Sequence, residues 1–389
     1  MLNIIKIIVF SSFLIACNKI ETFIPKEDAN LGDINISSGI NQIVTIPESA
    51  NKSIVDNFTR YTKMSSSSDL PIHIIAQNEV KDEVILRIKD IFNHYFNNDS
   101  TLSKFGEYKL LVNDKIAENK GTIAIYNSQL EKEEISNKLV DLDLNILALT
   151  SADIVFESSE DFKENNAIDH SYSKIAAFIM EFGIKDVVPS FFDELIQAAD
   201  NAISNNYWFS VDLAMVGADE ETRGLLYLEN IIEVYYDLWA HNETGLSNNE
   251  TYRFNSRDAL MWGDFKGYEI VSSFFPPYID FNIKLNIPND TIFSLVYDKS
   301  LPYTLKSQHF SAITIEGNNN IKIIGNSYNN FIQGNNGTNI YCMNGMFEEF
   351  NITNSNGIIF IEDSVPLRNG LDKLVNIDFV QFQDTIIEL

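Results

Sequence analysis

The sequence is short of basic residues. It contains 28 Lys and Arg against 55 Asp and Glu, which gives a formal charge of −27 over 389 residues. Proteins that bind nucleic acid or anionic lipid surfaces need clustered Lys and Arg, so this balance argues against both kinds of partner. Apolar residues are not lacking, since 45% of the chain is hydrophobic and 12% aromatic. That content can offset the chain entropy of about two domains and argues against disorder of the whole chain.

Cysteine is also scarce, because only Cys17 and Cys342 are present. An apolar run over residues 7–16 follows Lys6. The run is too short to cross a bilayer as a permanent helix and is typical of a secretory signal. Its end, Leu14-Ile15-Ala16-Cys17, resembles a bacterial lipobox, which implies a signal peptide over residues 1–17 and lipidation of Cys17. An ordinary signal peptide with an incidental cysteine is the alternative.

The lipobox resemblance implies where the protein is attached. The mature chain would be exported and held by its lipid at the bacterial outer membrane or cell surface, with the periplasmic face as the alternative. Once Cys17 is modified, Cys342 has no partner in the chain, which excludes a disulfide framework. Residues 18–50 are polar and contain Pro25 and Pro47. This composition predicts a flexible tether between the lipid and the folded body.

Motifs of common catalytic sites are missing. The five histidines do not form the H-E-x-x-H spacing that puts two imidazoles on one helix face. The sequence has no G-x-S-x-G elbow, no phosphate-binding loop and no G-x-G-x-x-G. Neighbouring carboxylates are expected by chance in so acidic a chain, and the spacing of a glycosidase pair is a three-dimensional distance.

Hydrophobic periodicity predicts an α+β fold for residues 51–300. Apolar runs at 72–75 and 122–126 predict strands, each followed by an amphipathic helix. A helical middle follows, and a strand pattern returns after Pro276-Pro277. The helices are expected over residues 79–95, 131–139, 172–182 (with Gly183 as the C-cap), 191–203, 225–238 and 257–275.

Residues 301–389 predict a repetitive architecture. From Glu316 the sequence falls into units of nine, with Gly325 and Gly334 one unit apart. A turn glycine and one inward apolar residue in each unit predict a short parallel β-roll, which is a kind of β-solenoid. The apolar residues that recur at this step are Ile323, Ile332 and Tyr341.

These units resemble the haemolysin-type calcium-binding repeat, G-G-x-G-x-D-x-U-x, and residues 368–384 resemble the cap segment that follows such repeats in secreted bacterial proteins. The resemblance implies calcium held by oxygen ligands. The Asp of the sixth position is replaced by Ile321, Asn330 and Asn339, and Asn brings no charge to offset dehydration of the ion. We therefore favour a metal-free solenoid stacked through Asn side chains. The candidate calcium ligands are Asn330, Asn339, Asp363 and Asp372.

The order of a strand–helix unit, a helical middle and a trailing repeat module resembles secreted metallopeptidase-like proteins. The resemblance implies zinc ligands on the helix at 172–182, but this helix contains no histidine, so the zinc site is expected to have been lost. The remaining candidates for a metal or catalytic site are His170, Glu181, Glu229 and Glu233. Nothing in their spacing brings them together.

The function that these features favour is non-catalytic. We expect a lipoprotein of the bacterial surface or periplasm that binds a protein, peptide or glycan partner. One alternative is a metal-dependent hydrolase whose ligand set is not recognised. Another is a structural or export-assisting role for the repeat module.

Overall fold

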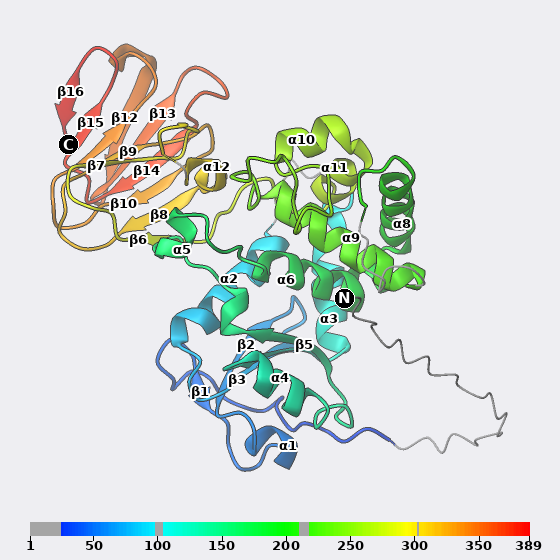
Figure 1. Ribbon diagram of the computed structural model, residues 1–389. Helices are drawn as coiled ribbons and strands as arrows, with labels where there is room; N and C mark the ends of the chain where they lie inside the picture. The colour runs from blue at the N-terminus through cyan, green and yellow to red at the C-terminus, as the bar shows by residue number, and fades with distance from the viewer. Residues whose placement is uncertain (1–24, 98–103, 210–217, 302) are drawn as a thin grey trace, which may run out of the picture.

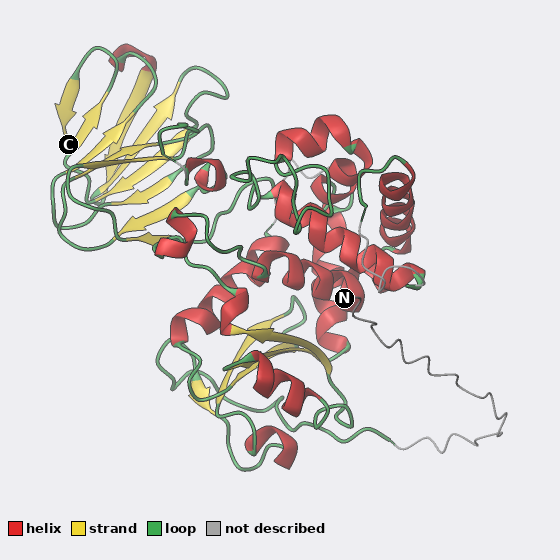
Figure 2. Ribbon diagram, in the orientation of Figure 1, coloured by secondary structure: helices red, strands yellow, loops and turns green. Residues whose placement is uncertain are grey.

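The computed structural model describes residues 25–97, 104–209, 218–301 and 303–389. The predicted α+β class is confirmed, and Figure 2 shows how helices and strands separate. In Figure 1 the chain passes from a helix-flanked sheet, through a helical middle, into a second region of strands that contains the carboxy terminus. None of the helices in these residues is long and apolar enough to cross a membrane.

The first region contains a five-stranded sheet. Its strands, in sheet order, are β1 (Val44–Thr45), β2 (Arg60–Ser65), β3 (Pro71–Ala76), β4 (Gly121–Tyr126) and β5 (Asn145–Thr150). The last three are parallel, β2 is antiparallel to β3, and β1 is an edge strand that is antiparallel to β2. The helices of this region are α1 (Lys52–Val55), α2 (Asp82–Phe96), α3 (Lys109–Glu118) and α4 (Gln129–Ser136).

The two faces of this sheet pack against different cores, because alternate residues of a strand point to opposite faces. Ile72 and Ile74 of β3 belong to the main hydrophobic core, which also takes the buried side of α2. Ile75 belongs to a second, smaller core. His73 shares the face of Ile75 and is thus placed on the side of the smaller core.

The predicted flexible tether differs from the structure where it is described. Residues 25–50, here called the amino-terminal segment, fold over the smaller core, and Leu31 and Ile46 are buried in it. The backbone of Glu27 is hydrogen-bonded to Asp141 and Asp143. The segment has the polar composition of a linker, but its few apolar residues are used to cover one face of the sheet.

The helical middle agrees with the predicted helices in position, but some of their ends differ and one predicted helix is broken in two. Its helices are α5 (Glu160–Lys163), α6 (Ser171–Ile179), α7 (Lys185–Val187), α8 (Pro189–Ser204), α9 (Glu220–Tyr235), α10 (Arg257–Gly263) and α11 (Phe265–Ser272). Gly183 is not a C-cap but lies in a π-helical turn, Met180–Ile184, that continues α6. A Cβ at Gly183 would lie 2.8 Å from side-chain atoms of Val112 and Ile116, so this glycine permits close packing against α3. The predicted helix at 257–275 breaks at Asp264, whose carboxylate caps α11.

The strands of the last region alternate between two sheets. Four parallel strands form the core of one sheet: β6 (Ile283–Leu285), β8 (Ala312–Ile315), β10 (Phe331–Gln333) and β14 (Leu371–Val375). Four form the core of the other: β7 (Thr291–Ser294), β9 (Ile321–Ile324), β11 (Asn339–Cys342) and β15 (Phe379–Gln381). Antiparallel strands β12 (Phe350–Ser355), β13 (Ile358–Asp363) and β16 (Ile386–Glu388) extend the sheets, and α12 (Thr304–Ser307) lies in a connection.

In this region the predicted inward residues agree with the structure, but the predicted start of the region does not. Ile323, Ile332 and Tyr341 are fully buried, as the nine-residue step predicts. The predicted boundary at residue 301 is wrong, because β6 and β7 already pair with β8 and β9. The sheets therefore begin near Ile283, in a stretch that lacks the glycine pattern of the later repeats.

Buried charged groups join the three regions. Arg87 of α2 contacts Glu157 and Asp169. His94 of α2 pairs with Asp280, just before β6, at 2.5 Å between Nδ1 and Oδ1. The first region is thus fixed, through α2, to the helical middle and to the chain before β6 by directional polar contacts as well as by the shared core.

Candidate functional site

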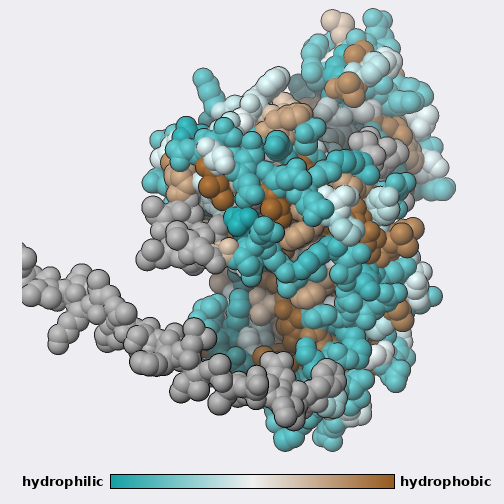
Figure 3. Space-filling view, turned by 90° about the vertical axis from the view of Figure 1, so that its right-hand side faces the viewer, coloured by the Kyte–Doolittle hydropathy of each residue, from teal (hydrophilic) through white to brown (hydrophobic). Residues whose placement is uncertain are grey.

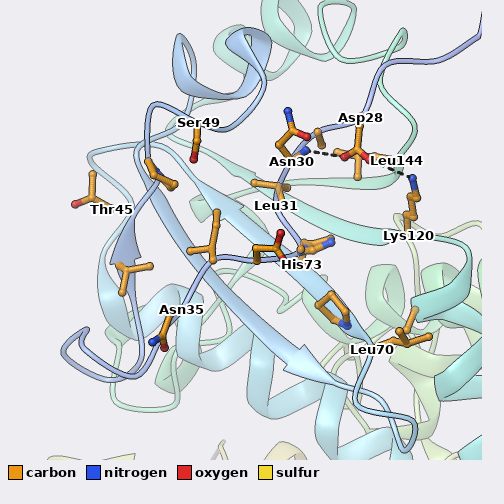
Figure 4. Close-up of a pocket in the computed structure, with 18 of the residues that line it drawn as sticks. Asp28, Asn30, Leu31, Asn35, Thr45, Ser49, Leu70, His73, Lys120 and Leu144 are labelled. Carbon is orange, nitrogen blue, oxygen red and sulfur yellow. Dashed lines mark hydrogen bonds and ion pairs between the residues drawn. The ribbon is translucent and has the colours of Figure 1, made fainter.

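A cavity of ≈ 1000 Å³ lies between the amino-terminal segment and the first sheet (Figure 4). Its lining comes from residues 28–35, from β1, from the start of β3 and from the end of α3. It is larger than the cavities against β9 and β11 (≈ 410 Å³) and against β4 and β5 (≈ 340 Å³). Pro71, Lys120 and Leu144 in its lining stand at the amino-terminal ends of the parallel strands. Ligands of α/β sheets usually bind at the opposite, carboxy-terminal ends, so the covering segment creates this site.

His73 is the most buried ionisable group of the lining. Its side chain is only 6% exposed, and its Nδ1 lies 2.9 Å from the hydroxyl oxygen of Tyr61. The Tyr61 hydroxyl donates to the carbonyl oxygen of Leu31 at 3.1 Å. Figure 4 shows His73 close to Leu31, with the segment passing over the strand. This chain of contacts ties the covering segment to the floor of the cavity.

The charges of the cavity are mixed. Its lining includes the carboxylates of Asp28, Asp33 and Glu118 and the ammonium group of Lys120. Lys120 pairs with Asp143 at 2.6 Å and more loosely with Asp28 at 4.0 Å. Burial, together with the positive charge of Lys63, lowers the pKa of His73 to about 4. His73 is therefore neutral near pH 7.

Of the catalytic candidates, the structure brings His170 and Glu233 together. His170 stands at the N-cap of α6, and its Nδ1 lies 2.7 Å from Oε1 of Glu233 in α9. Glu233, which is 3% exposed, also accepts from Ser173 and from the Trp239 indole, each at 2.7 Å. The hydrogen bond to Glu233 raises the pKa of His170, whose side chain is 42% exposed.

The other two candidates take different positions. Glu229 lies one turn before Glu233 on α9, and burial raises its pKa although Lys174 acts in the opposite sense. Glu181 lies on the π-helical turn, where partial burial of its carboxylate and the nearby Glu221 raise its pKa. Glu181 does not join His170 and Glu233.

The pair formed by His170 and Glu233 has the geometry of an oriented base, but within the described residues neither side chain lines any of the cavities named here. Asp169 and Tyr172, which flank His170 in the sequence, line a cavity of only ≈ 10 Å³, and His170 is not in its lining. That volume holds about one water molecule. In the described parts of the chain, no three His, Cys, Asp or Glu side chains are grouped so that they could hold a metal ion.

The candidate calcium ligands are engaged with protein donors. Asn330 and Asp372 meet inside the last region, where Oδ1 of Asp372 accepts from the backbone N–H of Asn330 at 2.8 Å. The Tyr341 hydroxyl contacts Oδ2 of Asp372 at 2.7 Å and Oδ1 of Asn330 at 3.1 Å. Burial raises the pKa of Asp372 to about 7. A partly protonated, fully buried carboxyl group is a poor ligand for a hard cation.

Asn339 and Asp363 lie apart from that pair of residues. Asn339 repeats the contact of Asn330 one unit later, because its backbone N–H donates to Asp378 at 2.7 Å. Asp363 accepts from Arg368, whose guanidinium lowers the carboxyl pKa against the effect of burial. The predicted lipidation site, Cys17, lies outside the described residues. Cys342 is half-buried, and burial raises the pKa of its thiol.

The cavity was missed by the sequence-based interpretation. Residues 28–35 lay in the predicted tether, and His73 was assigned only to a strand. A signal was present, because Leu31, Ile34, Ile43 and Ile46 are more apolar than a linker requires. Their spacing fits neither a helix nor a strand, so it does not predict the surface they cover.

Comparison with protein-family models and with curated proteins found no significant match to this chain. The resemblances to a lipobox, to calcium-binding repeats and to metallopeptidase-like proteins therefore stay predictions.

Proposed function

We propose that this chain is an exported bacterial lipoprotein, anchored through Cys17, that binds a small ligand in the cavity under its amino-terminal segment and catalyses no reaction. The observation that carries the proposal is the cavity itself, which is large enough for a ligand and combines apolar walls with the buried imidazole of His73 and several charged side chains. Cavities of this size and composition are typical ligand sites.

A hydrolase is the second candidate, and the contact between His170 and Glu233 favours it. A histidine held by a buried carboxylate is a common arrangement for a general base. Two observations within the described residues weigh against it: His170 lines none of the cavities named above, and no set of metal-ligating side chains is grouped there. A metallopeptidase-like ancestor that has lost its zinc remains compatible with both candidates.

The last region is proposed to be a β-roll that stabilises the protein without calcium. Support comes from the alternation of consecutive strands between two parallel sheets and from the repeated Asn contacts. Figure 3 shows one side of the molecule, where polar residues predominate and hydrophobic residues are scattered. On that side, a ligand cavity explains binding better than a broad apolar docking face does.

Blocking the cavity should abolish ligand binding. Gly32 lines the cavity, and a Cβ added there meets no heavy atom within 4 Å, so the Gly32→Trp side chain can enter the open space. We expect affinity for any ligand of this site to fall by about a hundredfold or more, because the indole competes for the same volume. Isothermal titration calorimetry measures the loss.

The matched control for Gly32→Trp is Leu130→Trp, on the exposed side of α4 in the same region. This variant should bind the ligand as the unmodified chain does, and both variants should keep their far-ultraviolet circular dichroism. Undiminished ligand binding by Gly32→Trp would contradict the proposed site.

The anchoring part of the proposal has its own test. The Cys17→Ser variant, expressed in a bacterium that processes lipoproteins, should move from the membrane fraction to the soluble fraction, because one lipid-modified residue supplies its membrane affinity. Fractionation and immunoblotting measure the shift. Retention of the serine variant in the membrane fraction would show that another feature holds the protein there.

A further inference from the structure

The hydrogen-bonding state of His73 limits what the cavity can bind. The Tyr61 hydroxyl has one proton, and it contacts both the Leu31 carbonyl oxygen and Nδ1 of His73. Because the hydroxyl has a single proton, both contacts can be hydrogen bonds only in one arrangement. The hydroxyl donates its proton to the carbonyl oxygen of Leu31 and accepts a hydrogen bond from Nδ1–H of His73. The neutral imidazole then carries its lone pair on Nε2, which has no hydrogen-bond partner among the described residues. This atom keeps some exposure to the cavity that His73 lines, so a molecule in the cavity can donate to it.

The rest of the cavity also offers acceptors in excess. The carboxylates of Asp28, Asp33 and Glu118 accept only. The ammonium group of Lys120 is paired with Asp143 at 2.6 Å and lies farther from Asp28, at 4.0 Å. Lys63, which stands opposite His73 in the register of β2 and β3, adds one positive charge near the ring. Three carboxylates in the lining still outnumber these ammonium groups, within a chain of formal charge −27.

We propose that the ligand of this cavity is a small organic cation with an ammonium group on an apolar chain. This inference rests on the ligand-binding function proposed above. The ammonium group donates to Nε2 of His73 and lies near the carboxylate of Asp28. The apolar chain packs against the aliphatic part of the lining, which includes Leu31, Val44 and Leu70. An anion would meet three carboxylates and a bare lone pair against only the two ammonium groups of Lys63 and Lys120. A metal ion lacks the grouped set of three ligands that it needs in the described residues.

Three probes of equal length separate the ligand classes: 1,5-diaminopentane, 1,5-pentanediol and glutarate. Calorimetry at pH 7.5 and low salt should detect binding of the diamine, with the diol weaker by about tenfold or more because it carries no charge. Glutarate should not bind at concentrations up to about 10 mM. Tighter binding of glutarate, or equal binding of the diol and the diamine, would overturn the cationic assignment.

Two substitutions of His73 form a matched pair. In His73→Asn the side-chain amide can keep the contact with Tyr61 but has no atom at the Nε2 position. In His73→Gln an acceptor oxygen can take the Nε2 position, while the contact with Tyr61 is lost. We expect the asparagine variant to lose about tenfold or more in diamine affinity and the glutamine variant to stay within about threefold of the original. The opposite order, or equal affinities, would contradict the role of Nε2.

The failure of this inference differs from failure of the proposed function. If the diol or glutarate binds and Gly32→Trp abolishes that binding, the cavity is a ligand site and only the ligand class is wrong. If no probe binds, or if Gly32→Trp leaves all binding unchanged, both proposals fail.

Discussion

Replacing Arg87 with methionine should destabilise the folded protein by about 3–5 kcal/mol. Arg87 is 6% exposed, and its guanidinium contacts Glu157, Asp169 at 3.3 Å and the Tyr172 hydroxyl at 3.4 Å. It also lies over the ring of Phe281, 4.6 Å from the centroid. Without the arginine, two carboxylates stay buried but lose their main compensating positive charge. Burying an unpaired charge costs more free energy than an intact buried ion pair contributes to stability.

The location of Arg87 gives the substitution a wide effect. One guanidinium contacts residues of the helical middle and, through Phe281, the chain just before β6. Urea unfolding at pH 7, followed by tryptophan fluorescence, measures the free energy of unfolding. The matched control is Lys52→Met, which breaks an exposed pair with Asp56 and should change nothing measurable. Lys306 of α12 lines the same small cavity as Glu157 and Asp169. A loss below about 1 kcal/mol for Arg87→Met would show that water or this ammonium group compensates the two carboxylates.

Replacing Asp372 with asparagine should stabilise the protein at pH 8 by roughly 4 kcal/mol at most. Asp372 is fully buried, and burial raises its pKa from 3.8 to about 7. Between these two pH values the unfolded chain releases the proton while the folded chain retains it. Folding therefore becomes less favourable as the pH rises through this interval, and the full cost is reached above about pH 7.

Asparagine at position 372 removes this cost and keeps the contacts. Its carbonyl oxygen can accept from the backbone of Asn330, and its amide can donate to the Tyr341 hydroxyl, which already contacts Oδ1 of Asn330. The gain in the free energy of unfolding should vanish at pH 4, where the carboxyl group is protonated in the folded protein. Urea unfolding at both pH values measures it.

The chain offers a matched control for this prediction. Asp378 is exposed and accepts from the backbone of Asn339, which is the same contact one repeat later. Asp378→Asn should show no comparable gain at pH 8. If Asp372→Asn is instead destabilising at pH 8, and EDTA destabilises the unmodified chain equally, a bound cation stabilises the ionised carboxylate and the calcium hypothesis is restored.

Sequence periodicity predicted those helices and strands that bury a single apolar face against the core. The stripe of Val84, Ile88, Ile91 and Tyr95 identified α2, because steps of three and four residues place these side chains on one helix face. The nine-residue step identified the buried positions of the last region for the same reason. The start of that region, at β6, was missed because its alternating apolar residues come without turn glycines, and alternation alone indicates a strand but not a repeat.

Contacts between distant parts of the chain were not predictable in the same way. His170 and Glu233 were both named as candidates, but their contact depends on how α6 packs on α9. A glycine at position 183 is typical of a helix end, but here it lies within the π-helical turn and lets α3 pack closely against it. The cavity depends on a covering segment whose polar composition conceals its fold. In each case tertiary packing decided what local sequence could not.

If Cys17 carries the lipid anchor proposed above, the ordered start of the amino-terminal segment sets how far the folded body can move from the membrane. Ten peptide units separate Cys17 from Glu27, whose backbone is fixed to Asp141 and Asp143. Fully extended, they span at most about 35 Å, whereas a tether reaching residue 50 would span about 115 Å. With Cys17 held in the membrane by its lipid, Asp28 at the cavity would stay within about 40 Å of the membrane surface. The cavity would then sample molecules released or attached at the membrane surface, where their local concentration exceeds that in bulk solution.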